Sequence, residues 1–190
     1  MKHTIMTILA LLISIAASAQ SAEKLYDEGK ALYDAKNYNQ AFPKLKAAAE
    51  KGHRKAQYRL GRCYEKGHGV DGDEAKAFQW YSKSAAQDYA KAQYQLGQCY
   101  KNGEGIEKNA VKAVEYFTKA AKQDNADAQL ALGKCYLKGR GVAADEGKAK
   151  TWFNRAVKNE KDGKKILEEL RKEAADGDEK AKAILALIKK

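Results

Sequence analysis

Apolar and polar positions repeat along this chain with a period of 36 residues, which the three cysteines mark. The block around Cys63 reads Ala-Gln-Tyr-Arg-Leu-Gly-Arg-Cys-Tyr and ends in a Gly-x-Gly-Val segment. Similar blocks surround Cys99 and Cys135. A fixed period of roughly 20 to 50 residues is typical of supersecondary units that stack on one another. The pattern therefore predicts a repeat array.

The first part of each block has the spacing of a helix with one apolar face. In the first copy this face comprises Ala56, Leu60, Cys63 and Tyr64, which predicts a helix over 56–66. The glycines that follow should end the helix, because a glycine just past a helix can take the left-handed conformation that closes the last carbonyls. The apolar residue after them is expected to lie beneath the loop. In the three copies this residue is Val70, Ile106 and Val142.

A glycine also recurs inside this helix, at Gly61, Gly97 and Gly133. Glycine in a helix interior costs about 1 kcal/mol relative to alanine. Its return in every copy therefore indicates a use for the missing side chain. We expect that use to be close approach of the neighbouring helix.

A second helix is predicted to begin in each unit at a residue whose side chain can cap it. These residues are Asp73, Asn109 and Asp145. The inward stripe of this helix combines large aromatic with small residues. In the first copy it comprises Ala77, Trp80, Tyr81 and Ser84, and Tyr116 and Trp152 are the later equivalents of Trp80. Basic residues recur on the same helix, at Lys76, Lys112 and Lys148 and at Lys83, Lys119 and Arg155. We interpret their long stems as a cover for the core rather than as ligand contacts.

The cysteines are expected to be small, buried and reduced core residues. Their number is odd, whereas a disulfide framework usually shows an even count. Helices in adjacent units lie roughly 10 Å apart, and a disulfide needs Cα atoms within about 7 Å. Two histidines, His53 and His68, fall at positions that vary between copies, where we expect solvated side chains.

The complete motif resembles a known family. The pattern is Ala-x-x-x-Leu-Gly-x-x-Tyr-x-x-Gly-x-Gly-Val, followed by Asp, Lys-Ala, Trp-Tyr and Lys-Ala-Ala. It resembles the Sel-one-like repeat of the tetratricopeptide-like group, with full copies at 54–89, 90–125 and 126–161. The resemblance implies an all-α fold, a right-handed superhelical solenoid of antiparallel helix pairs. It also implies the usual role of such arrays, a scaffold that binds other proteins or peptides.

Both ends depart from the repeat pattern. Residues 25–51 are expected to form a shorter, tetratricopeptide-like helix pair, whose second helix Pro43 should kink or delay. Residues 162–190 are expected to form two further helices, parted near Gly177, that cover the last exposed repeat face. Their expected apolar contacts are Leu167, Leu170, Ile184, Leu185, Leu187 and Ile188.

In tetratricopeptide-like arrays the first helix of each pair lines the concave wall. By this resemblance the candidate partner-binding groove comprises Tyr26, Lys30, Tyr33, Tyr58, Arg62, Glu65, Tyr94, Gln98, Lys101, Leu130, Lys134 and Leu137. Tyr and Arg are favoured at the centres of interfaces, so one hypothesis is a groove for an extended or helical segment with acidic character. The other is that Tyr58 and Tyr94 only pack over the neighbouring helix.

No motif typical of a catalytic or metal site occurs in the sequence. It contains no His-Glu-x-x-His, Cys-x-x-Cys, nucleophile elbow or phosphate-binding loop. We therefore expect no catalytic residue, no cofactor and no metal. An alternative stays open, because some cysteine-rich exported relatives in this repeat family have been associated with β-lactam or cell-wall recognition. Those relatives pair two cysteines per unit, whereas this chain has one.

The first 19 residues have the features of a cleaved signal peptide. A short basic start precedes an apolar run, and Ala17-Ser18-Ala19 fits a cleavage site. The run is too short for the roughly 20 residues that span a bilayer, so we expect a periplasmic or secreted solenoid over 20–190 and no stable membrane insertion. The net charge of +11 favours acidic partners, and the absence of a nucleic-acid-binding motif argues against nucleic acid.

Overall fold

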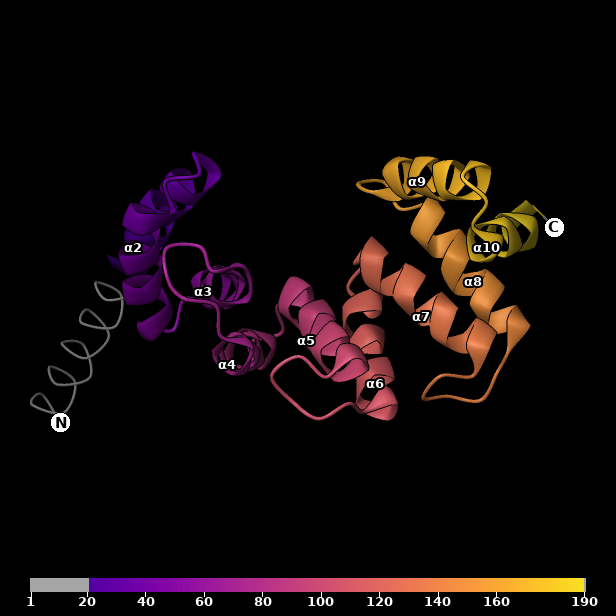
Figure 1. The fold of residues 1–190 in the computed structure, drawn as a ribbon, viewed down its shortest axis with the longest axis horizontal. Helices are drawn as coiled ribbons and strands as arrows, with labels where there is room; N and C mark the ends of the chain where they lie inside the picture. Colours follow the sequence, from indigo (N-terminus) through magenta and orange to yellow (C-terminus); the bar gives the residue numbers. More distant parts are fainter. Residues whose placement is uncertain (1–20, 190) are drawn as a thin grey trace, which may run out of the picture. The chain divides into compact units, whose positions relative to one another are not determined.

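The computed structural model describes residues 21–189, and all regular structure in this range is helical (Figure 1). A first helical stretch covers 21–34. The helices that follow are α2 (Tyr38–Glu50), α3 (Arg54–Lys66), α4 (Glu74–Ala85), α5 (Ala90–Asn102), α6 (Ala110–Lys122), α7 (Ala126–Lys138), α8 (Glu146–Val157), α9 (Gly163–Ala175) and α10 (Glu179–Lys189). The expected all-α fold of paired helices is confirmed. The expected signal peptide lies outside the described residues.

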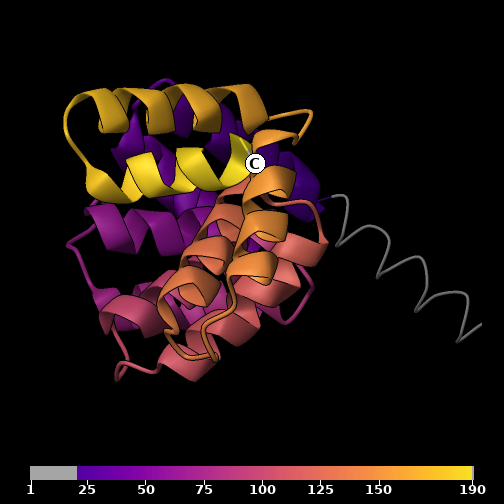
Figure 2. The ribbon, with the colours of Figure 1, turned by 90° about the vertical axis from the view of Figure 1, so that its right-hand side faces the viewer.

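The chain divides between Tyr89 and Ala90 into two compact units. In the first unit α3 packs against both α2 and α4. In the second unit α5 packs against α6, and α7 against α8. Figure 2 shows α9 and α10 side by side at the C-terminal end of the second unit, where both contact α8. Each unit therefore contains helix pairs of the predicted kind.

Each second helix of a full repeat is capped as its sequence predicts. Oδ1 of Asp73, Asn109 and Asp145 accepts from the backbone N–H three residues later, at 2.9, 2.9 and 2.8 Å. The first helices end at glycines in the left-handed conformation, with φ of 66° at Gly67 and 61° at Gly139. The loops thus start and stop the helices through local hydrogen bonds.

The glycine inside each first helix allows an aromatic ring from the second helix to lie against the backbone. A Cβ placed on Gly61, Gly97 or Gly133 would come within 2.6, 2.4 or 2.5 Å of a ring carbon. The rings belong to Tyr81, Phe117 and Phe153, which are fully buried. The predicted close approach of the two helices is therefore confirmed.

The neighbouring aromatic position lies nearer the surface than its place in the predicted inward stripe suggests. Trp80, Tyr116 and Trp152 are half-buried. Each carries a cation over its ring: Lys83, Lys119 and Arg155 lie 4.0, 5.1 and 4.9 Å from the respective centroids. Lys76, Lys112 and Lys148 lie in the same way over the tyrosines of the first helix, Tyr64, Tyr100 and Tyr136. These contacts support the interpretation that the recurring basic side chains cover the core.

One loop residue differs from the expectation, because Ile106 is exposed rather than buried beneath its loop.

All three cysteines are buried and form no disulfide, as predicted. Burial raises the pKa of the Cys63 thiol to about 11 and also raises the pKa of Cys135. Because the thiolate is the reactive form, these protonated thiols are unreactive and contribute to packing.

A buried glutamine follows the first alanine of each repeat, at Gln57, Gln93 and Gln129. Gln57 Oε1 accepts from Gln87 at 2.8 Å, and Gln93 Oε1 accepts from Gln123 at 2.7 Å. The third repeat differs, because the shorter Asn159 stands where the other two have Gln87 and Gln123. Its side-chain N–H donates to the Asp124 carbonyl, and its Oδ1 accepts from the backbone N–H groups of Lys161 and Asp162. Among the described residues, Gln129 Oε1 therefore has no hydrogen-bond partner.

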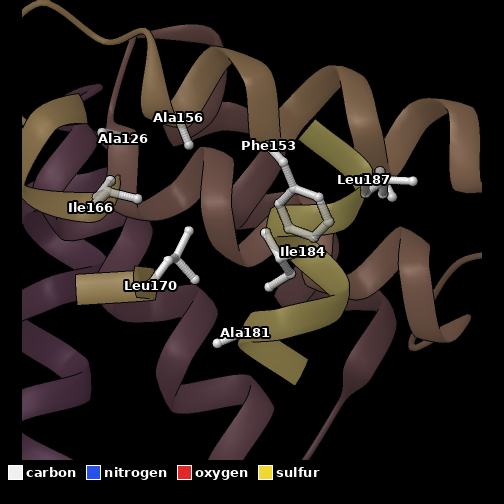
Figure 3. Close-up of a cluster of buried hydrophobic side chains, with 9 residues drawn as sticks. Ala126, Phe153, Ala156, Ile166, Leu170, Ala181, Ile184 and Leu187 are labelled. Carbon is white, nitrogen blue, oxygen red and sulfur yellow. The ribbon is translucent and has the colours of Figure 1, made fainter. Parts of the chain in front are cut away.

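The two terminal pairs form, with two corrections to the sequence expectations. Of the two effects expected of Pro43, a kink or a delayed start, the delay does not occur: α2 starts at Tyr38, because the backbone bond from Ala41 to Asn37 closes its first turn before the proline. At the other end, Asp178 caps α10, and Ile166 rather than Leu167 enters the core. Figure 3 shows Ile166 and Leu170 of α9 with Phe153 of α8 and Ile184 of α10 in one buried cluster.

Candidate partner-binding surface

In the first unit, three predicted groove residues on α3 form one polar network. Arg62 Nη1 donates to the Tyr58 hydroxyl at 3.4 Å, and Arg62 Nε lies 3.9 Å from Glu65 Oε2. The Tyr81 hydroxyl of α4 donates to the same carboxylate. Burial raises the pKa of Glu65, but hydrogen bonds from Lys66 and Tyr81 outweigh it and hold the pKa below its usual range. The Glu65 carboxylate is thus charged and engaged within the unit.

The three predicted residues of the N-terminal helical stretch are used differently from one another. Lys30 is exposed and pairs with Asp34 at 2.9 Å. The Tyr33 hydroxyl lies 3.0 Å from His68 Nδ1, and its ring lies beneath the Arg59 guanidinium. Tyr26 is 7% exposed and stacks on His53, so its ring belongs to the core of the unit.

The expectation of solvated histidines is wrong for both residues. His53 is the N-cap of α3, where Nδ1 accepts from the Ala56 N–H at 3.1 Å and Nε2 lies 2.8 Å from Glu23. His68 stacks on Tyr38 with ring centroids 3.8 Å apart. Variable positions proved to be tertiary contacts here, because each ring packs against an aromatic residue of the atypical N-terminal pair, which the repeat pattern does not describe.

The second unit brings six of the predicted groove residues to one pocket of about 560 Å³. They are Tyr94, Gln98, Lys101, Leu130, Lys134 and Leu137. On α5, Gln98 donates to the Tyr94 hydroxyl at 2.8 Å and accepts from Lys101 at 3.0 Å. The Tyr94 ring also lies 5.9 Å from Phe117, so this tyrosine both packs over the neighbouring helix and lines the pocket.

The pocket is also lined by residues that are not part of the predicted groove. Lys138 and Arg140 come from the end of α7 and its loop, and Glu173, Asp178, Lys180, Ala181 and Ile184 come from α9, α10 and the turn between them. No repeat motif points to this second group, because α9 and α10 replace the regular pair with a different sequence. Variation between copies was the available signal for Lys138 and Arg140, whose equivalents in the second copy are Asn102 and Glu104.

Five basic and three acidic side chains line the pocket, so its charge is positive. Among the acids, Asp178 is engaged as the N-cap of α10 and accepts from Lys180 and Ala181 N–H at 2.7 and 3.0 Å. Desolvation and the positive charges of Lys180 and Arg140 lower the pKa of Lys138. The cations at this end of the pocket are therefore close enough to repel one another.

Residues 21–189 contain no group of three or more His, Cys, Asp or Glu side chains placed to hold a metal ion. In the same range no helix is long and apolar enough to cross a membrane.

The fold and these contacts define a helical repeat protein built from paired helices with a shared interior plan. A model of the Sel1 repeat matches residues 54–89, 90–125 and 126–160, more than half of the chain. The chain belongs to the Sel1 repeat family, whose members are generally non-catalytic scaffolds for protein interaction.

Solved structures of related proteins agree with this assignment. A Sel1 repeat protein from Oxalobacter formigenes is 33% identical with a TM-score of 0.69, over 85% of this chain and 74% of that protein. A protective antigen of uropathogenic Escherichia coli with an SLR fold is 32% identical with a TM-score of 0.71, over 78% of this chain and 33% of that protein. Cysteine rich protein B of Helicobacter pylori is 28% identical with a TM-score of 0.51, over 64% of this chain and 93% of that protein. No curated protein matches the chain.

Proposed function

We propose that this protein is an exported scaffold that binds a segment of another protein in a groove of its second unit, lined by the first helices of the last two full repeats, α5 and α7. The observation that carries the proposal is the pocket of the second unit, which six side chains of the predicted groove line. It combines apolar surface from Leu130 and Leu137 with the polar tips of Tyr94 and Gln98. Such a mixture is typical of interface centres.

Export rests on the first 19 residues, whose basic start, apolar run and small-residue cleavage pattern suit a signal peptide. The proposal expects the mature chain to begin at Gln20. N-terminal sequencing of the protein recovered from the periplasm or medium tests this. An intact Met1 on exported protein, or retention in the cytoplasm, contradicts it.

The pocket gives less support to the alternative function, an enzyme that acts on β-lactams or on the cell wall. Cys135 lines it, but burial raises the pKa of this thiol and keeps it protonated. A nucleophilic cysteine requires the opposite shift. We therefore propose binding without turnover, and expect purified protein to leave a chromogenic β-lactam intact.

The binding proposal is tested by a pull-down from cell-envelope extract with purified variants. Tyr94→Ala combined with Gln98→Ala removes two pocket side chains, whereas Lys164→Ala changes an exposed residue outside the pocket. With far-UV circular dichroism unchanged, we expect the double variant to lose a partner that Lys164→Ala and the natural chain retain. Equal recovery by all three proteins contradicts the groove.

A further inference from the structure

One stripe of α7 distinguishes the third repeat from the other two. Leu130, Lys134, Leu137 and Lys138 follow one another at helical spacing and all line the pocket. Leu130 and Leu137 are half-buried, and the two lysines between and beside them are exposed. At the positions of the two leucines, the second repeat has Tyr94 and Lys101. The leucine pair is therefore a local feature of this repeat.

The terminal helices place a further cation opposite this stripe. Lys180 lies in the first turn of α10, and Arg140 follows the end of α7; both line the pocket with Lys134 and Lys138. Within the described part of the chain, none of these four cations forms an ion pair with a carboxylate. Elsewhere on the chain, lysines such as Lys119 and Lys182 pair at 2.6 and 2.7 Å with a carboxylate on their own helix.

The lining also carries the carboxylates of Asp127, Glu173 and Asp178, and Asp178 attracts Lys134, Lys138 and Lys180 without forming an ion pair with them. Five cations against three carboxylates leave a net positive charge, which attracts a bound anion. A single carboxylate, such as a chain terminus, brings one negative charge to this site. An acidic run brings several, and it can place each carboxylate near a different lysine. The leucines offer apolar area to a side chain of the same segment, whose burial contributes about 25 cal/mol per Å².

We propose that the pocket formed by α5, α7 and α10 binds an acidic protein segment, with an apolar side chain against Leu130 and Leu137 and side-chain carboxylates at Lys134, Lys138, Arg140 and Lys180. The terminal helices then do more than cover the last repeat, since α10 supplies one wall of the site. This inference rests on the proposed function, because it names the chemistry of the segment that the groove takes.

The test uses fluorescein-labelled peptides with blocked ends and fluorescence anisotropy on the full chain. The acidic probe alternates leucine with Glu and Asp. The other probes replace the acids by Gln and Asn, replace them by Lys, replace leucine by alanine, or leave the C-terminus free. We expect the acidic probe to bind at least about tenfold more tightly than the neutral and basic ones, and to weaken with added salt. The alanine probe should also bind more weakly, and freeing the C-terminus should add less than the side-chain acids do.

Charge-reversed variants locate the site. Lys134→Glu with Lys138→Glu should reduce the affinity for the acidic probe at least about tenfold. The matched control, Lys164→Glu with Arg171→Glu, makes the same change in net charge at exposed positions of α9 outside the pocket, and should change affinity less than about twofold.

The outcomes separate this inference from the proposed function. Neutral or basic probes that bind as tightly as the acidic one, and compete with it at the pocket, overturn the acidic chemistry and leave the groove standing. Equal losses in the pocket and control variants show attraction to net charge alone and overturn the site. Failure of every probe, together with an unchanged pull-down by the Tyr94 and Gln98 variant, overturns both.

Discussion

The contact between a glycine of the first helix and a buried ring of the second gives a sharp stability prediction. A Cβ on Gly97 would lie 2.4 Å from Cδ1 and Cε1 of Phe117, whereas carbon atoms in contact prefer about 3.5–4.0 Å. The ring must therefore move by about 1 Å, and Phe117 is 0% exposed. Overpacking of this kind costs about 1–3 kcal/mol, and the better helix propensity of alanine returns about 1 kcal/mol. We therefore expect Gly97→Ala to lower the free energy of unfolding by up to about 2 kcal/mol.

A second glycine of the same unit provides the control for this change. Gly147 lies in the first turn of α8, and a Cβ there would meet Asp145 Oδ1 at an ordinary 3.5 Å. Gly147→Ala should therefore stabilise the protein by about 0.5–1 kcal/mol through helix propensity alone. Urea unfolding followed by circular dichroism at 222 nm measures both variants. Equal stability of the two alanine variants would refute the proposed close contact.

The clash also predicts a coupling between the two side chains. Phe117→Leu alone should destabilise the protein, because it opens a cavity in the core. In the double variant Gly97→Ala with Phe117→Leu, the new methyl group occupies part of that space. The double variant should therefore lose less stability than the sum of the single changes, by about 1 kcal/mol. An additive result would contradict the packing described here.

Three further predictions concern a cap, a loop and the thiols. Hydrogen bonds from the backbone and side chain of Lys148 lower the pKa of Asp145. The ionised Asp145 cap therefore stabilises the fold above about pH 4, and this stabilisation is lost as the pH falls through the pKa of the folded state. Asp145→Asn, which places the residue of the second copy (Asn109) at this position, should reduce the loss of stability at acid pH in a stability–pH curve. Gly141 has a φ of 73°, and a Cβ there would lie 2.1 Å from the Ala110 carbonyl oxygen. Gly177 has a φ of 96° but no atom within 4 Å of a Cβ, so alanine there brings only the backbone strain of about 1 kcal/mol. Gly141→Ala should therefore lower the free energy of unfolding in urea clearly more than Gly177→Ala. Ellman's reagent at pH 8 should react slowly with the native chain and find three thiols after denaturation, because the cysteines are buried and burial raises the pKa of Cys63 to about 11; fewer than three would reveal a disulfide.

The repeat core could be predicted from the sequence because equivalent contacts between a helix glycine and a buried ring recur in every full copy. Gly61 and its equivalents indicate a close approach between the two helices of a repeat, although the sequence does not say which ring fills the space. The caps at Asp73 and Asn109 are local, because each side chain bonds the backbone N–H three residues later. Such features follow from local geometry and one period of the pattern. They need no knowledge of how the units are arranged.

The candidate site was predictable only where it follows the same period. Tyr94, Gln98 and Lys134 were found because they occupy one face of the first helices. Lys180 was not predicted as a groove residue, and Ile184 was predicted only as a core contact, because their place in the pocket depends on how α9 and α10 pack on α8 and this pair has its own sequence. Tyr26 and the two histidines were misjudged for a similar reason, since Tyr26 stacks on His53 and Tyr38 stacks on His68 in contacts of the N-terminal pair that the repeat pattern does not describe.

Site-specific photo-crosslinking shows whether a partner occupies the pocket of the second unit. A benzophenone amino acid placed at Gln98 lies in the pocket, and the same probe at Lys164 lies on an exposed position outside it. In cells that produce the full chain, the account predicts a discrete crosslinked species from position 98 that the probe at position 164 does not give. The same species from both positions, or a species from position 164 alone, would contradict a partner-binding groove.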